Sequence, residues 1–149
     1  MIIPWAKPSI TKKDIFHAQN ALKSQWISLG DYVYKLEKRL KNFLKVNYLG
    51  VVSSGTAAIN LAYLVLGLKP GDEIIVPGFG YLAAANIAKS MGLKVVFADV
   101  DPNTFCVSFN TISKVLTKKT KAIVVVHTYG NVCEMKQIVS LSKRKGIYL

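Results

Sequence analysis

Hydroxyl side chains and a glycine gather where one apolar run of the sequence gives way to another. The segment VVSSGTAAI, residues 51–59, passes from β-branched residues through Ser53, Ser54, Gly55 and Thr56 into a run of helix formers. A helix that begins there leaves backbone N–H groups free to bind an anion, helped by the helix dipole. An ordinary helix cap, in which Ser53 or Ser54 satisfies those donors, fits the same residues. The local pattern leaves both readings open, and it is neither a Walker loop nor GxGxxG.

A second glycine-rich turn, PGFGYLAAAN, covers residues 77–86. Its glycines allow close approach of the backbone, and Tyr81 can offer a ring face to a planar group. Taken alone, the pattern favours core packing of Phe79 and Tyr81. A third turn, HTYG at 127–130, follows the fourth apolar run, and its His127 could be an acid, a base or a polar core residue. Without a carboxylate nearby in sequence, a structural role is favoured for His127.

Short β-rich runs alternate with amphipathic helical stretches. Strands are expected at 49–53, 73–77, 94–98, 121–126 and 147–149. Helices are expected near 12–24, 32–46, 56–68, 81–91, 110–118 and 134–145. Apolar strands spaced one helix apart predict βαβ units, hence an α/β fold with a mostly parallel sheet and flanking helices. Ligands bind such sheets at the carboxyl ends of the strands, where all three turns would lie.

The composition excludes several classes of protein. With 149 residues, 51% of them hydrophobic, the chain is not a disordered one. Its two cysteines form neither a disulfide framework nor a metal cluster, so no metal site is expected. No run is long enough to cross a bilayer and no signal peptide is visible, which predicts a soluble, cytoplasmic protein without a membrane partner.

The net charge of +12 is unevenly distributed. Residues 1–47 carry +6, residues 48–112 carry −1 and residues 113–149 carry +7. The cations therefore avoid the glycine-rich middle, and many fall off the apolar stripe of the predicted helix 32–46. A solvated surface is the favoured interpretation, with the cations of 35–45 and 114–121 scattered in space. A nucleic-acid partner is not expected.

The order and spacing of these segments resemble the N-terminal part of the DegT/DnrJ/EryC1/StrS aminotransferase family, and especially its perosamine-synthase-like members. These are pyridoxal-phosphate enzymes of fold type I that act on keto nucleotide sugars. The matching segments include WIS at 26–28, SGTAA at 54–58, PGDEIIVP at 70–77, FADVD at 97–101 and HTYGNVCEM at 127–135.

The resemblance implies a role for each candidate residue. Gly55 and Thr56 would hold the phosphate of pyridoxal 5'-phosphate, Ser54 would support the turn, and Tyr81 would stack on the pyridine ring. Gly80 stands where the family usually has a hydroxyl residue. The family's pyridine-binding aspartate and Schiff-base lysine would follow residue 149, so no catalytic residue is assigned and the large domain is expected to be truncated.

The resulting expectation has two parts. Residues 1–47 would be an N-terminal helical segment, and residues 48–149 the first part of a fold-type-I cofactor-binding domain. The full-length parent would be a homodimer that transfers an amino group from an amino acid to a keto nucleotide sugar, and the chain alone would be inactive. Two alternatives stay open: a sugar dehydratase of the same family, in which histidine replaces the lysine, and a non-enzymatic basic α/β module that binds nucleic acid.

Overall fold

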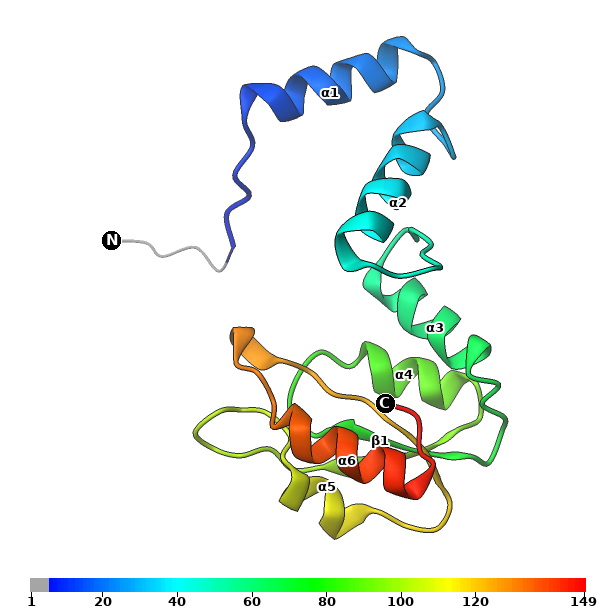
Figure 1. Cartoon of the computed structure of the whole chain (residues 1–149), viewed down its shortest axis with the longest axis vertical. Coiled ribbons are helices and arrows are strands. Elements are labelled where there is room, and N and C mark those ends of the chain that lie inside the picture. The colour runs from blue at the N-terminus through cyan, green and yellow to red at the C-terminus, as the bar shows by residue number, and fades with distance from the viewer. Residues whose placement is uncertain (1–5) are drawn as a thin grey trace. The chain divides into compact units, whose positions relative to one another are not determined.

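The computed structural model describes residues 6–149, which divide into two compact units, 1–51 and 52–149. Each unit is described by itself. The first holds helices α1 (Lys12–Lys23) and α2 (Asp31–Leu44). The second holds, in chain order, α3 (Gly55–Val65), β1 (Glu73–Pro77), α4 (Ala83–Ser90), β2 (Lys94–Ala98), α5 (Phe109–Val115), β3 (Thr120–Ile123), the 3-10 turn η1 (Thr128–Gly130) and α6 (Met135–Lys145) (Figure 1). None of the described helices has the length and apolar character needed to cross a bilayer.

The two helices of unit 1–51 bury no side chain, and only α1 has a side-chain cap at its N-terminus. A capping box starts α1, in which the Thr11 N–H donates to the Asp14 carboxylate at 2.7 Å and the Thr11 hydroxyl accepts from the Asp14 N–H at 3.3 Å. Neither α1 nor α2 buries a single side chain. A longer-range bond follows α2, where the Val51 N–H donates to Glu37 Oε1 at 3.0 Å.

Unit 52–149 is built on a parallel sheet in the order β2-β1-β3. In the central strand, Ile75 lies opposite Val96 of β2 and Ile123 of β3. We call the edge at which the strands begin the amino edge and the edge at which they end the carboxyl edge. The α/β architecture with parallel strands confirms the prediction from the alternating apolar runs.

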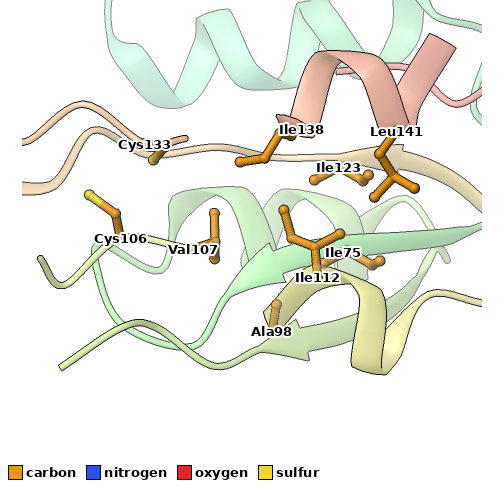
Figure 2. Packing of buried hydrophobic residues seen from close by; sticks show 9 residues of the cluster. All are labelled: Ile75, Ala98, Cys106, Val107, Ile112, Ile123, Cys133, Ile138 and Leu141. Carbon is orange, nitrogen blue, oxygen red and sulfur yellow. The ribbon is translucent and has the colours of Figure 1, made fainter. Parts of the chain in front are cut away.

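Successive side chains of β1 point to opposite faces of the sheet, and each face has its own core. Ile75 belongs to the core under α5 and α6, together with Ala98, Val107, Ile112, Ile123, Ile138 and Leu141 (Figure 2). Ile74 and Val76 belong to the core under α3 and α4. A strand buried on both faces reads as a continuous apolar run, which is why the run at 73–77 was recognisable.

The predicted strand at 49–53 is wrong. This segment has no strand pairing in the described part of the chain, and its Val51 N–H is taken by Glu37. The side chains of Val51 and Val52 are each 38% exposed. The segment pairs with neither β2 nor β3, the two edge strands of the described sheet. The run at 147–149 forms only an isolated parallel bridge, between Tyr148 and Ala122.

Two buried cysteines lie in the core under α5 and α6 (Figure 2). The Cys106 thiol donates to the Asn131 carbonyl and the Cys133 thiol to the Val126 carbonyl, each at 3.2 Å. Burial, together with the neighbouring Cys106 thiol, raises the pKa of Cys133 to about 11. The Cys133 thiol is therefore protonated at neutral pH, and the bond from Cys106 to Asn131 ties together the segments that follow β2 and β3.

A buried carboxylate marks the start of β1. Glu73 is 1% exposed, and its Oε1 accepts hydrogen bonds from the hydroxyls of Thr117 at 2.6 Å and Thr120 at 2.8 Å. Its Oε2 lies 3.3 Å from the Lys94 ammonium. Burial acts to raise the pKa of Glu73, but the bonds from Thr117, Thr120 and Lys94 outweigh it and hold the pKa below its ordinary value. Glu73 thus joins all three strands at the amino edge.

Candidate functional site

The N-terminus of α3 has both a side-chain cap and free N–H donors, the two readings that the sequence left open. Ser54 is the cap, because its hydroxyl accepts from the Ala57 N–H at 3.1 Å and its carbonyl from the Ala58 N–H at 3.0 Å. The N–H groups of Gly55 and Thr56 donate to no atom of the described part of the chain. A capped helix end with two free donors can still bind an anion.

A cavity of about 480 Å³ brings the two glycine-rich turns together. It is lined by Thr56, Gly80, Tyr81, Leu82, Ala83 and Asn86. Tyr81 is 90% exposed, so core packing, which the local pattern favoured, is wrong for this residue. The structure places the Thr56 turn and the Tyr81 ring around one cavity, although they are 25 positions apart in the chain.

A second helix N-terminus lines the same cavity. Leu82 is the N-cap of α4 and makes no side-chain capping bond, so the first N–H groups of this helix have no side-chain acceptor at the cap. The positive dipole ends of α3 and α4 therefore face one cavity. The sequence reasoning missed this contribution and that of Asn86. The sequence does contain a signal for the uncapped α4 N-terminus, because Leu82, directly before Ala83, is not one of the usual capping residues Ser, Thr, Asp or Asn.

Gly80 requires its glycine for conformational reasons. Its φ is +139°, a region that residues with a side chain rarely adopt, while a Cβ at this position would meet no other atom within 4 Å. A side chain at position 80 would have room, but it would not tolerate this φ value. A hydroxyl residue, which the family usually has here, would therefore need a different backbone conformation before Tyr81.

Three aromatic rings meet at the carboxyl edge, one from the segment after each strand. Phe79, Phe105 and Tyr129 have ring centroids 5.4, 6.1 and 6.3 Å apart. Phe105 and Tyr129 hold left-handed backbone conformations, with φ of 57° and 55°. Phe79 is 39% exposed and packs in this group rather than in the core.

His127 is exposed and makes a structural contact. Its Nδ1 accepts a hydrogen bond from the Cys133 N–H at 3.2 Å, which fixes the loop between β3 and α6. The structure thus shows the structural role that the sequence favoured for His127, although on the surface rather than in the core.

Residues 8–149 match the DegT/DnrJ/EryC1/StrS aminotransferase family. The chain belongs to this family. It is 41% identical over 148 residues to the GDP-perosamine synthase of Escherichia coli O157:H7, an alignment that covers 99% of this chain and 41% of that protein. The chain therefore spans about two fifths of the length of this relative.

Solved structures share the fold. An aminotransferase from Psychrobacter cryohalolentis superposes with a TM-score of 0.89 at 30% identity, over 98% of this chain and 37% of that one. The GDP-4-keto-6-deoxy-D-mannose-3-dehydratase of E. coli, solved with bound hydrated PLP, gives 0.89 at 29% identity, over 97% and 39%. Nearly the whole chain therefore shares its fold with parts of both solved proteins.

The residues around the cavity fit a pyridoxal phosphate. The phosphate group offers only hydrogen-bond acceptors. The Gly55 and Thr56 N–H groups and the Thr56 hydroxyl form a matching set of donors at a helix N-terminus. The unpacked ring of Tyr81 supplies an apolar face to a planar heterocycle in the same cavity. The chemistry of the donor set and the shape of the cavity therefore agree with the group.

Proposed function

We propose that the protein to which this chain belongs transfers an amino group from an amino acid to a keto nucleotide sugar. The observation that carries the proposal is the shared cavity of Thr56 and Tyr81 at two helix N-termini. Family membership and the similarity to GDP-perosamine synthase support it. Pyridoxal phosphate, when bound, supplies the electron sink that amino transfer requires.

This chain's own residues bind and orient. The Gly55 and Thr56 N–H groups hold the phosphate, with Ser54 keeping the turn in place through its bond to Ala57. Tyr81 would offer its ring face to the pyridine ring. The dipoles of α3 and α4 add a positive potential, which favours the dianionic form of the phosphate.

Binding of the cofactor by the 149-residue chain tests these roles. Pyridoxal phosphate and pyridoxal, which lacks the phosphate, are titrated and followed by absorbance and tyrosine fluorescence. We expect the phosphate form to bind at least about tenfold tighter, because only it can use the α3 N-terminus. Thr56→Val and Tyr81→Ala should each weaken it severalfold.

Matched controls separate these effects from general damage. Tyr48→Ala removes a ring that is as exposed as Tyr81, at 92%, from the other unit, and Thr104→Val removes a hydroxyl from another loop. Equal affinity for pyridoxal and pyridoxal phosphate would refute the phosphate site. For the longer protein, mass spectrometry of the sugar product after incubation with an amino acid tests the transfer itself.

The dehydratase is the second candidate, because the E. coli dehydratase matches this chain as well as the aminotransferases do. The two reactions give different products, since a dehydratase removes a hydroxyl from the sugar and adds no nitrogen. The same mass measurement distinguishes them. A homodimer and a cytoplasmic location stay predictions, and sedimentation of the longer protein tests the first.

A further inference from the structure

Nearly all cations of unit 52–149 lie at one end of it. The unit has eleven Lys and Arg residues, all of them exposed. Lys136, in the first turn of α6, is at the carboxyl edge. The other ten lie at the amino edge: Lys69, Lys89, Lys94, Lys114, Lys118, Lys119, Lys121, Lys143, Arg144 and Lys145.

The topology puts them there. Each strand begins and each connecting helix ends at this edge, and Figure 1 shows the ends of α4 and α6 on the same side of the unit. Lys118 and Lys145 line one hollow of about 470 Å³. The Lys121 carbonyl accepts from the Tyr148 N–H at 3.0 Å, which holds the end of the α6 connection against β3. The cations of 114–121 are therefore gathered, contrary to the scattered arrangement expected from the sequence.

Acidic residues do not neutralise this edge. Only Asp72 and Glu73 lie there, and Glu73 is buried against Lys94. The remaining acids of the unit, Asp99, Asp101 and Glu134, follow strands and lie at the carboxyl edge. The only other ion pair in the described part of the chain is between Lys35 and Asp31 of α2.

Helix dipoles explain part of the arrangement. Lys89, Lys114 and the three cations of 143–145 sit in the last turns of helices, where positive charge is favoured. Lys69, Lys118, Lys119 and Lys121 precede or begin strands and have no such reason. Like charges held together in this way repel one another unless an opposite charge is near.

We propose that the amino edge is a docking surface for an anionic phospholipid bilayer. We choose this partner because of charge complementarity. Each lysine near an anionic bilayer is attracted to it, and the attractions of the clustered lysines add up. Nine of the ten cations are lysines, which bind phosphates as point charges without bidentate base or phosphate recognition. Single-stranded nucleic acid needs a row of rings on which successive bases stack. The exposed aromatic side chains beside these cations are Tyr148, in the segment after α6, and Phe97, which lines a hollow with Lys89 on another part of the unit.

The contact is electrostatic and peripheral. It goes beyond the sequence-based expectation of no membrane partner, which rested on the lack of a spanning run. Since the cofactor cavity contains the N-termini of α3 and α4, and the docking surface contains the C-terminus of α4, a bilayer at the amino edge leaves the cavity open.

Flotation of the 149-residue chain with vesicles in a density gradient tests the proposal, because only protein bound to lipid rises and aggregated chain sinks. Vesicles of phosphatidylcholine with about one third phosphatidylserine are compared with pure phosphatidylcholine at low salt and at about 0.5 M NaCl. We expect binding only to the anionic vesicles, and its loss at high salt, where charges are screened within about 4–5 Å. The variant Lys118→Glu/Lys121→Glu/Lys145→Glu should bind at least about tenfold more weakly. The matched control Lys23→Glu/Lys38→Glu/Lys41→Glu makes the same charge change in the other unit and should bind nearly as the parent chain does.

Each other outcome overturns the proposal. No binding to anionic vesicles removes the docking surface. Equal losses in the two triple variants show that net charge, rather than the amino edge, attracts the bilayer. Tighter binding to single-stranded or duplex DNA than to vesicles at the same salt makes the partner a nucleic acid. Unchanged circular dichroism of both variants confirms that the comparison is between folded proteins.

Discussion

At the scale of single residues, the two most informative side chains are at opposite edges of the sheet. Tyr81 is almost fully exposed although it is a large aromatic residue, and Glu73 is almost fully buried although it is an acid. Both break the usual distribution of residue types between surface and interior. The buried acid is explained by hydrogen bonds from Thr117, Thr120 and Lys94, and the exposed ring would be explained by the proposed cofactor.

Glu73 should make stability depend on pH in the acid range. Because its native pKa lies below its ordinary value of 4.5, its contribution is complete above that value and is lost as the pH falls through the lowered native pKa. Glu73→Gln should cost about 1–3 kcal/mol at pH 7 and much less near pH 3. Urea unfolding at the two pH values measures the difference.

The control for this prediction is Glu134→Gln, the same chemical change at an exposed carboxylate of the carboxyl edge. Its effect should be small and similar at both pH values. A Glu73→Gln variant that loses as much stability at pH 3 as at pH 7 would contradict the role of the ionised carboxylate.

At the scale of elements, two similar helix caps start helices that differ in how much they contribute to the core. Ser108 starts α5 by accepting from the Thr111 N–H at 3.2 Å, and α5 carries the fully buried Ile112. Thr11 starts α1 with an equivalent capping box, but α1 buries nothing. Ser108→Ala should therefore lower the free energy of unfolding of unit 52–149 by about 1 kcal/mol. Thr11→Ala should leave that transition unchanged, as measured by circular dichroism in urea. Equal shifts from both substitutions would show that α1 shares the cooperative core.

The same scale shows where the sequence was informative. The bounds predicted for β1 and β2 agree with the structure. For β1 the reason is that a strand buried on both faces is a local apolar run. The segment 49–53 is also rich in apolar residues, but it pairs with no described strand. Strand pairing depends on residues far away in the sequence, so local composition does not reveal it. The site shows the same division. The α3 turn was visible from its hydroxyls, whereas the role of the α4 N-terminus depends on which helix lies beside it.

At the scale of the whole molecule, the chain exposes much apolar surface. In unit 1–51, Trp26 is 68%, Ile27 79% and Phe43 82% exposed, and neither helix buries a side chain. Exposed apolar area of this kind promotes association. We expect the isolated 149-residue chain to aggregate or to melt at low temperature, as light scattering during a thermal ramp would show.

The isolated chain should also lack aminotransferase turnover. Its relative is more than twice as long, and the resemblance places the cofactor-binding lysine after residue 149. Pyridoxal phosphate binding without turnover, assayed with an amino acid and a keto nucleotide sugar, is the expected result. A soluble monomer with measurable turnover would refute both the stability and the activity predictions.

The two free, buried thiols under α5 and α6 can report on motion of the loops at the carboxyl edge. An alkylating reagent attacks a thiolate. The side chains of Cys106 and Cys133 are both buried while the loops around them stay closed, and burial raises the pKa of Cys133. The rate at which they are labelled at neutral pH therefore counts openings of the segments that carry Phe105 and Tyr129. A ligand that steadies these loops should slow the labelling, even if it touches neither sulfur.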